Sequence, residues 1–203
     1  MNKRIPHIIL FGCGGHSRSV ADVLVLNDPT VSLLFVDGNA RDNEKLYGFD
    51  VVRHIDPTGR PYFFALGDNR QRKMIFDEIG VSNLISVISV KAHMGYKSTV
   101  GKGCFIANYC HIGPEAEIGH NTIINTSAVI EHEVKIGNHS HIGPRAVISG
   151  KSSIRDLVFI GVGAVVKDNI AICSKVIIGA GATVINNIDE PGTYVGTPVR
   201  KIS

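Results

Sequence analysis

A repeat of six residues runs through the C-terminal half of this 203-residue chain and restricts its fold more than any other feature. An aliphatic residue returns at every sixth position, with no exception and no insertion. The fifteen members of this column are Val100, Ile106, Ile112, Ile118, Ile124, Ile130, Ile136, Ile142, Ile148, Ile154, Ile160, Val166, Ile172, Ile178 and Val184. A period of six matches neither the 3.6 residues of a helical turn nor the two of a strand. It indicates a prism whose faces are short strands and whose corners are tight turns.

A second column of small or aliphatic residues lies four positions after the first. Its members are Cys104, Cys110, Ala116, Thr122, Ala128, Val134, Ser140, Ala146, Ser152, Val158, Ala164, Ile170, Val176, Ala182 and Ile188. We expect the first column to fill the interior and the second to occupy the corners. Three hexapeptides complete one triangular coil, so residues eighteen apart stack at about 4.8 Å, the spacing of paired strands. The pattern predicts five coils, and Ile88 and Met94 extend its register toward the N-terminus.

Glycine often follows the first column. It does so at Gly101, Gly113, Gly119, Gly137, Gly143, Gly161 and Gly179. Glycine near a turn permits backbone angles that are closed to other residues. We therefore expect these glycines to supply the unusual angles of the corners.

Residues 1–80 have a different sequence pattern, without the six-residue repeat. Apolar runs at 5–11, 31–36 and 62–66 predict buried strands, and a helix is expected after the first and the third. Strand, glycine-rich turn, helix and strand are typical of a small Rossmann-like α/β unit with a parallel sheet. The predicted fold is thus an α/β unit followed by an all-β parallel β-helix.

The two predicted domains cover residues 1–82 and 83–203, and the second ends in a short C-terminal tail. The helix expected after the third strand carries Arg70, Arg72 and Lys73. The join between the domains is expected near residues 80 to 88.

The turn after the first strand reads Gly12-Cys13-Gly14-Gly15-His16 and comes directly before the predicted helix. Backbone N–H groups at the positive end of a helix favour a phosphate. The pattern departs from the dinucleotide fingerprint G-x-G-x-x-G because residue 17 is serine. Asp37 ends the second strand, where a ribose hydroxyl is often bound.

Three interpretations of this turn remain open. A dinucleotide cofactor is one, and a tight turn without a ligand is another. The unit is about half the length of a full dinucleotide domain. A single nucleoside diphosphate therefore has the better size for it.

One histidine of the repeat lies outside the first column and between two acidic residues. His132 has Glu131 and Glu133 as its neighbours. A carboxylate partner orients an imidazole and raises its basicity, which suits a general base near neutral pH. In acyl transfer from a thioester, this base would take the proton of an attacking amine or hydroxyl. A backbone N–H would then hold the oxyanion.

Composition narrows the functional classes further. The net charge of +3 is mild and aromatic residues make up 6%, which disfavours a nucleic-acid-binding protein. The four cysteines form no C-x-x-C pair, and their spacing fits an intracellular protein whose thiols are reduced. No apolar run approaches the ~18 residues of a membrane span, and the first run is too short for a signal peptide. We therefore expect a cytosolic protein.

Five segments, in this order, resemble one family over nearly the whole chain. They are Gly12-Cys13-Gly14-Gly15-His16, Phe35-Val36-Asp37, Leu66-Gly67-Asp68-Asn69, residues 125–133, and Tyr194-Val195-Gly196-Thr197-Pro198. The chain resembles the hexapeptide-repeat sugar acetyltransferases of the sialic acid O-acetyltransferase and bacillosamine-pathway N-acetyltransferase family. The resemblance implies a left-handed β-helix, although parallel crossovers are normally right-handed. It also implies acetyl-CoA as co-substrate, no metal, and a homotrimer with its active site between adjacent subunits.

The same resemblance implies roles for single residues. His132 would be the general base and Glu133 would raise its basicity. His141 and the backbone near Val162 and Ala180 would contact acetyl-CoA in the groove between adjacent prisms. The nucleotide-linked sugar would be held by Gly14, Gly15, His16, Asp37, Gly38 and Gly67, with Asn125 near the acceptor.

The chain departs from the family pattern at two places. Cys13 and Gly14 stand where many members have Ser or Ala in the first loop. Gly38 replaces a second acidic residue that some members have. Gly38 has no carboxylate with which to make the contact expected there with the sugar nucleotide.

Four functions remain compatible with the sequence. The first is an N-acetyltransferase that acts on a nucleotide-linked amino sugar of the UDP-4-amino-4,6-dideoxy type in bacterial glycan biosynthesis. The second is an O-acetyltransferase acting on a sialic acid. The third is a zinc hydratase of the carbonic anhydrase type, which needs three converging histidines that the spacings do not supply. The fourth is a non-enzymatic spacer. The glycine-rich loop favours the first, because it suggests a nucleoside diphosphate handle.

Overall fold

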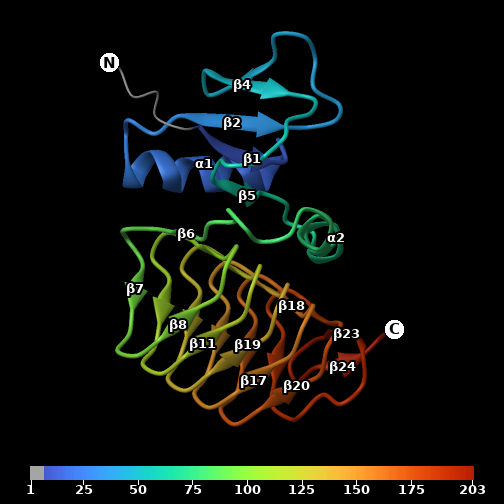
Figure 1. Ribbon diagram of the computed structural model, residues 1–203. Helices are drawn as coiled ribbons and strands as arrows, with labels where there is room; N and C mark the ends of the chain where they lie inside the picture. Colours follow the sequence, from blue (N-terminus) through green and yellow to red (C-terminus); the bar gives the residue numbers. More distant parts are fainter. Residues whose placement is uncertain (1–6) are drawn as a thin grey trace.

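The computed structural model describes residues 7–203, so that Ile5 and Pro6 of the first predicted strand lie outside the described residues. An α/β unit is followed by a parallel β-helix, which confirms the predicted fold class (Figure 1). The elements of the α/β unit are β1 (Ile8–Phe11), α1 (Gly15–Asn27), β2 (Leu33–Val36), β3 (Lys45–Leu46), β4 (Phe49–Val52), β5 (Tyr62–Phe64) and α2 (Asn69–Ile79).

The α/β unit is built on one sheet with the strand order β3-β4-β2-β1-β5. At its centre, Leu10 of β1 pairs in parallel with Phe35 of β2 and Phe63 of β5. Leu10 lies in the apolar cluster of α1, whereas its neighbour Ile9 lies in that of α2. Because helices cover both faces, β1 is a continuous apolar run instead of an alternating one.

The hairpin of β3 and β4 was not predicted from the sequence. β4 extends the sheet by pairing with β2, and β3 turns back along β4. Tyr47 and Gly48 form the two-residue turn, both with positive φ, as the twist of a tight hairpin requires. The strands are short and β4 contains Asp50, so neither gives a strong apolar signal.

The β-helix has three faces. We name one by the α/β unit that is docked on it and the other two by their outward side chains. The docked face contains β6 (Val87–Ile88), β9 (Phe105–Ile106), β12 (Ile123–Ile124), β15 (His141–Ile142), β18 (Phe159–Ile160) and β21 (Val176–Ile178), and continues into β23 (Gly192–Val195) and β24 (Arg200–Lys201). The valine face contains β7 (His93–Met94), β10 (His111–Ile112), β13 (Val129–Ile130), β16 (Val147–Ile148), β19 (Val165–Val166) and β22 (Thr183–Val184). The polar face contains β8 (Thr99–Val100), β11 (Glu117–Ile118), β14 (Lys135–Ile136), β17 (Ser153–Ile154) and β20 (Ala171–Ile172).

Both predicted columns lie inside this prism. Every member of the first column except the half-buried Val100 is buried, and so is every member of the second. Residues eighteen apart pair in register, as Ile112 does with Ile130. The predicted extension through Ile88 and Met94 is also confirmed, since both lie in strands that pair with the next coil.

The prediction for the glycines was wrong. Positive φ angles recur every six residues from 97 to 181, but at the third position after the first column, and only Gly103, Gly163 and Gly181 among these are glycine. The glycines next to the column are needed because consecutive coils approach closely there. A Cβ on Gly143, for example, would lie 2.6 Å from the carbonyl oxygen of Ile160. These glycines allow neighbouring coils to pack closely, and they are not required for positive φ angles.

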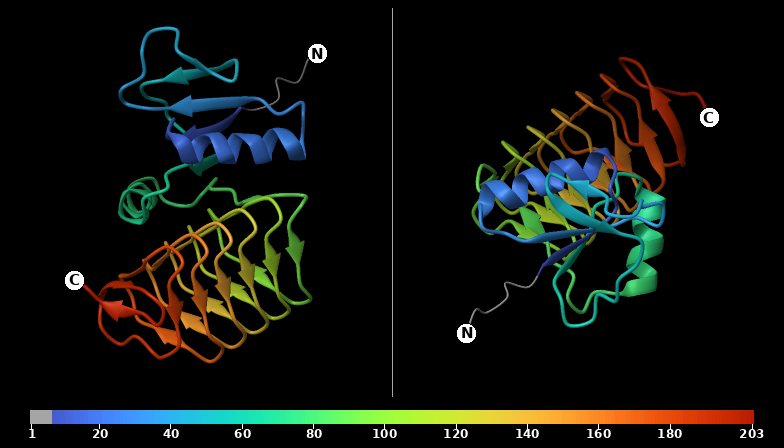
Figure 2. Two further views of the ribbon diagram at one scale, coloured as in Figure 1. Left: turned by 180° about the vertical axis from the view of Figure 1, so that it is seen from behind. Right: turned by 90° about the horizontal axis from the view of Figure 1, so that it is seen from above.

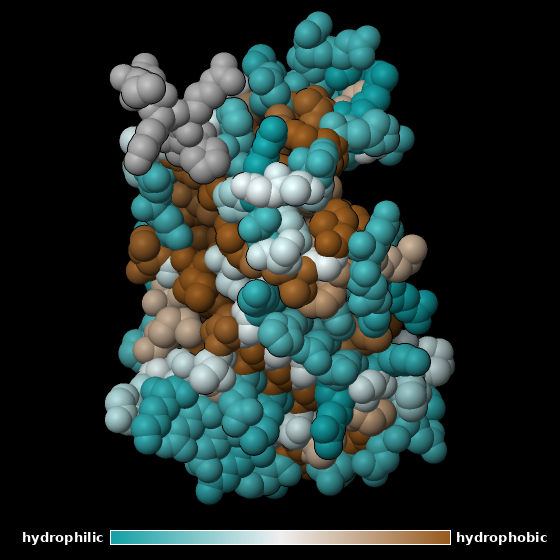
Figure 3. All heavy atoms as spheres, viewed as in Figure 1, coloured by the Kyte–Doolittle hydropathy of each residue, from teal (hydrophilic) through white to brown (hydrophobic). Residues whose placement is uncertain are grey.

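The small sheet stands on the prism with its β5 edge toward the docked face (Figures 1 and 2). α1 contacts β6, where Asn27 Nδ2 donates to the carbonyl of Ile88 at 2.7 Å. α2 lies over a corner of the prism, where Asn121 Nδ2 donates to the carbonyl of Arg72 at 3.2 Å. In the face drawn in Figure 3, hydrophobic side chains gather at the level where the two parts meet. The loops between β1 and α1 and between β5 and α2 are thereby held close to the prism.

Candidate active site

The glycine-rich turn joins β1 to α1 at the carboxyl edge of the sheet. Gly12 has φ +118°, and a Cβ there would lie 2.9 Å from the carbonyl oxygen of Ala65, so only glycine fits. Gly14 is the N-cap of α1 and Gly15 its first residue; no side chain caps the helix and no atom lies within 4 Å of a Cβ built on either glycine. The first N–H groups of α1 are therefore open to an anion, as a phosphate site requires.

Asp37 and Gly38 follow β2 at the same edge of the sheet. The Asp37 carboxylate accepts the backbone N–H of Asn39 at 2.9 Å, which fixes the turn. Gly38 is exposed and nothing lies within 4 Å of a Cβ built there. The loops after β1, β2 and β5 thus share the edge of the sheet at which open α/β folds bind ligands.

His132 and Glu133 lie at the corner between the valine face and the polar face. His132 Nδ1 is 3.0 Å from Glu133 Oε1, and each side chain is about half exposed. Because a carboxylate only accepts, this contact places the imidazole proton on Nδ1 and leaves Nε2 as the basic nitrogen. The ring lies over Gly150 of the next coil, where a Cβ would be 2.5 Å from Nε2. The pair has the geometry of an oriented general base.

His141 lies between the prism and the α/β unit and is only 8% exposed. Its Nδ1 is 3.2 Å from the carbonyl oxygen of Gly67, and its Nε2 is 3.1 Å from Asn125 Nδ2. Burial, followed by the charge of Arg72, lowers the pKa of His141 to about 4. It is thus a neutral imidazole that donates through Nδ1 and accepts through Nε2.

His16 points from the start of α1 into the same junction. Its ring lies edge-on to Phe105 at 5.2 Å and 6.2 Å from the ring of His141. Burial, together with His141 and Arg72, lowers its pKa to about 3. Its buried Nε2 has no hydrogen-bond partner within residues 7–203.

The neutral state of His141 predicts a loss of stability in mild acid. The folded protein keeps the ring neutral down to about pH 4, whereas the unfolded chain protonates it near pH 6.5. Stability is therefore full above pH 6.5 and falls as the pH drops toward 4. The loss at pH 5 is about 2 kcal/mol for this residue. Urea titrations at pH 7 and pH 5 should show a smaller loss for His141→Gln than for the exposed-residue control His54→Gln. An equal loss in both would contradict the neutral assignment.

The expected site residues fall into two groups in the single chain. Gly14, Gly15, His16, Asp37, Gly38 and Gly67 lie at the carboxyl edge of the sheet, where Gly67 contacts His141 and His141 in turn contacts Asn125. His132 and Glu133 lie at the corner opposite the docked face. Fold topology therefore separates the expected base from the expected nucleotide loop.

Val162 and Ala180 lie on successive coils at the corner between the docked and valine faces. Both are exposed, and their backbone nitrogens lie next to Gly143 and Gly161, respectively. His141 is instead covered by the α/β unit, so the three expected acetyl-CoA residues do not share one open surface in the single chain.

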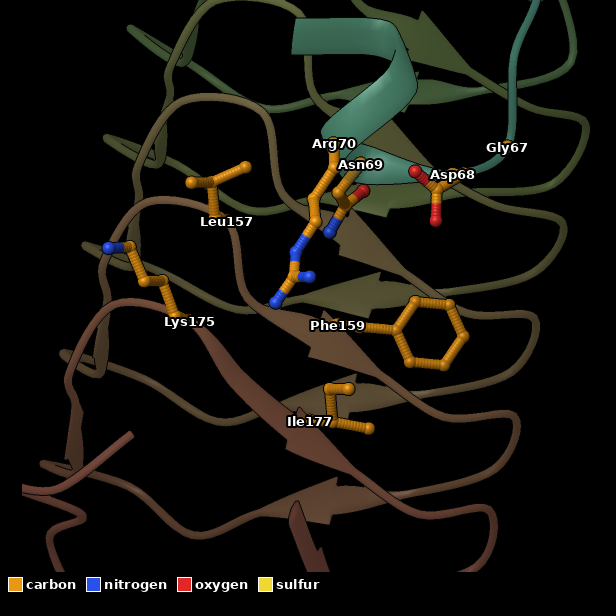
Figure 4. A pocket seen from close by; sticks show the side chains of 8 residues that line it. All are labelled: Gly67, Asp68, Asn69, Arg70, Leu157, Phe159, Lys175 and Ile177. Atoms are coloured by element: carbon orange, nitrogen blue, oxygen red, sulfur yellow. The ribbon is translucent and has the colours of Figure 1, made fainter. Parts of the chain in front are cut away.

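A cavity of about 530 Å³ opens between the N-terminus of α2 and the docked face (Figure 4). Its lining residues are Gly67, Asp68, Asn69, Arg70, Leu157, Phe159, Lys175 and Ile177. Leu157, Phe159 and Ile177 give the cavity an apolar floor. Arg70 and Lys175 bring two positive charges to its walls, and Asp68 brings one negative charge. Sequence reasoning missed this cavity, because its two walls are about ninety residues apart in the chain.

Residues 7–203 contain no group of three or more His, Cys, Asp or Glu side chains placed to hold a metal ion. None of their helices has the length and apolar character needed to cross a membrane.

Two known protein domains match the chain, one in each of the two parts that the structure shows. Residues 7–79 match the PglD N-terminal domain, and residues 97–132 and 116–150 match the bacterial transferase hexapeptide. A protein of Acanthamoeba polyphaga mimivirus is 30% identical over 107 residues, which are 51% of this chain and 21% of the viral protein. The chain thus spans about a fifth of that curated relative.

Solved structures match over nearly the full length. The acetyltransferase domain of PglB from Neisseria gonorrhoeae has a TM-score of 0.90 at 24% identity, covering 97% of this chain and 100% of that one. PerB from Caulobacter crescentus, in complex with CoA and GDP-perosamine, has a TM-score of 0.87 at 27% identity and covers 98% of both chains. WeeI from Acinetobacter baumannii has a TM-score of 0.86 at 24% identity, covering 97% of this chain and 99% of that one. The chain belongs to the PglD-type acyltransferases of the hexapeptide-repeat family.

Proposed function

We propose that the protein transfers the acetyl group of acetyl-CoA to the amino group of a nucleotide-linked 4-amino-4,6-dideoxy sugar, with UDP as the nucleotide, in bacterial glycan biosynthesis. The observation that carries the acyl-transfer step of this proposal is the His132–Glu133 pair, which leaves Nε2 free to accept a proton. PerB, at 27% identity, was solved with CoA and GDP-perosamine, which supports a nucleotide-linked amino sugar as acceptor. Acetyl-CoA and four free thiols favour the cytoplasm as the place of action.

The reaction needs one base and no covalent enzyme intermediate. The sugar amine attacks the thioester carbonyl carbon while His132 Nε2 takes the proton of the amine, and Glu133 stabilises the imidazolium that forms. A backbone N–H holds the negative oxygen of the tetrahedral intermediate. Collapse of the intermediate breaks the C–S bond, and the CoA thiolate receives the proton from His132. The products are the amide and CoA.

The separation of the two groups of residues favours a site shared between subunits. His132 lies at the corner opposite the α/β unit of its own chain, and in this proposal the glycine loop that meets it is that of a neighbouring subunit. The valine face supports such assembly, because Val129, Val147 and Val165 form an apolar ladder in which Val165 is 38% exposed. We propose a homotrimer, in which each groove between adjacent prisms carries one site.

The two anionic substrates have separate binding elements in this proposal. The open N–H groups after Gly14 hold the diphosphate of the sugar nucleotide, with Asp37, Gly38 and Gly67 beside it. Asn125 lies near the acceptor. Val162 and Ala180 offer exposed backbone along the prism to acetyl-CoA, and His141, on the neighbouring docked face, contacts the loop of Gly67.

The decisive assay measures acetyl-CoA turnover with purified protein over a panel of UDP- and GDP-linked amino sugars and free sialic acids. We expect release of free CoA only with a nucleotide-linked amino sugar, and formation of an amide on that sugar. Transfer only to free sialic acid would instead establish an O-acetyltransferase. The hydroxyl reaction uses the same base, so His132 alone does not separate the two.

A further inference from the structure

Among residues 7–203, Arg72 is the largest side chain that is completely buried. The mechanism above does not use it. Its guanidinium donates hydrogen bonds to one side-chain amide and to five backbone carbonyls. The acceptors are Asn69 Oδ1 (2.8 Å) and the carbonyls of Leu66 (2.9 Å), Gly67 (3.3 Å), Asn121 (3.0 Å), His139 (3.3 Å) and Ser140 (3.2 Å). None of these acceptors is charged. A buried cation held in this way is expensive, which implies a specific task.

The hydrogen bonds of Arg72 join three parts of the molecule. Nη1 reaches the loop after β5, Nη2 reaches the prism corner at 139–140, and Nε reaches the same corner one coil earlier, at Asn121. Only the planar guanidinium, with five N–H groups in a fixed fork, reaches all of them together. A lysine has a single nitrogen at the end of its chain and cannot do so.

One acceptor connects Arg72 to the candidate active site. The carbonyl oxygen of Gly67 lies 3.3 Å from Arg72 Nη1 and 3.2 Å from His141 Nδ1. A carbonyl has two lone pairs, so both contacts are made at once. This oxygen accepts from Nδ1 while Asn125 Nδ2 donates to Nε2, and the two contacts together place the proton of His141 on Nδ1.

Few groups near His141 can change its protonation state. His16 faces it from α1, Arg72 from α2, and Asn125 and Phe159 from the prism. Only His16 and Arg72 among these titrate. Burial keeps both histidines neutral, and the positive charge of Arg72 lowers their pKa further.

We propose that Arg72 is a positioning residue of the active site. Through the carbonyl of Gly67 it holds His141 as a neutral imidazole with its proton on Nδ1, and it fixes the loop at Gly67 against the prism. The consequence for substrate binding rests on the proposed function, because that function makes Gly67 and His141 members of the site. The consequence for the imidazole itself does not depend on any activity.

The primary test therefore reads the imidazole directly. The ¹⁵N shifts of histidine-labelled full-length protein are recorded between pH 8 and pH 5, and the His141 signals are assigned by their loss in His141→Gln. We expect the wild type to show a neutral ring with the proton on Nδ1 throughout. In Arg72→Lys the Nδ1 form should lose its dominance. An unchanged His141 ring in Arg72→Lys would overturn the proposal. If that variant fails to fold, Asn69→Ala removes one acceptor of the guanidinium and is read in the same way.

A double-mutant cycle separates positioning from simple attachment of the two parts. Arg72→Lys and His141→Gln should each lower kcat/KM by about tenfold, whereas Arg72→Lys should cost less than about threefold in the His141→Gln background. Arg60→Lys, on an exposed residue of the α/β unit, serves as the control. Losses that multiply fully would overturn the positioning role. A wild type that acetylates no nucleotide-linked amino sugar, yet shows the expected change of tautomer, would contradict the proposed function alone.

Discussion

Replacement of His132 by alanine is expected to lower kcat by ~10²-fold or more, with little change in KM for either substrate. The reason is that Nε2 is the nitrogen left free by the 3.0 Å contact between Nδ1 and Glu133. Without it, the amine loses its proton only to water. Steady-state kinetics at saturating acetyl-CoA and sugar nucleotide measure the loss.

Two further variants make this result specific. Glu133→Gln keeps a hydrogen-bonding partner but removes the charge that stabilises the imidazolium, so its loss should be smaller than that of His132→Ala. His54→Ala, on an exposed residue of the α/β unit, should have wild-type kinetics. Near-normal turnover in His132→Ala would reject the assignment of the base.

Gly14→Asp is expected to raise KM for the nucleotide-linked sugar by ~10²-fold, equivalent to about 3 kcal/mol, and to leave KM for acetyl-CoA unchanged. Gly14 is the N-cap of α1 and has open space around it, so an aspartate there fits without a clash. Its carboxylate would accept the N–H groups that we assign to the diphosphate and would repel that anion. Because aspartate is a good N-cap, the melting temperature should stay the same or rise.

Gly14→Ala is the matched control for this variant. It adds a Cβ in the same open space without a charge or an acceptor. Its effect on KM for the sugar should be far smaller than that of aspartate. Equal KM values for Gly14→Asp and the wild type would show that the diphosphate binds elsewhere.

The β-helix could be predicted from the sequence because its six-residue repeat is visible within any short stretch of the chain. Each coil repeats the same inward residues, so two columns of letters determine three faces and their stacking. The wrong prediction for the glycines has a physical reason. Every corner does require a left-handed residue, but the repeat places there residues such as Glu133, His139 and Arg145. Stacking on both neighbouring coils compensates for the modest strain of those backbones.

The arrangement of the site followed from the sequence only in part. Local motifs identified the glycine turn and the acidic neighbours of His132, since each occupies a few adjacent residues. Arg72 was read only as one of several cations on a helix, because its partners at Asn121 and Ser140 lie 49 and 68 residues away. For the same reason, the separation of His132 from the glycine turn was visible only in the folded chain.

We propose that each active site combines His132 of one subunit with the glycine loop of its neighbour. The most direct measurement co-expresses His132→Ala and Gly14→Asp chains with different tags and assays purified mixed oligomers. Each variant alone should be nearly inactive at low concentrations of the sugar nucleotide. Each mixed trimer holds two chains of one variant and one of the other, so one groove in three should pair an intact loop with an intact histidine, and activity should recover to about a third of the wild-type value. Mixed oligomers as inactive as the two parents would contradict the shared site, because a site within one chain always retains one of the two defects.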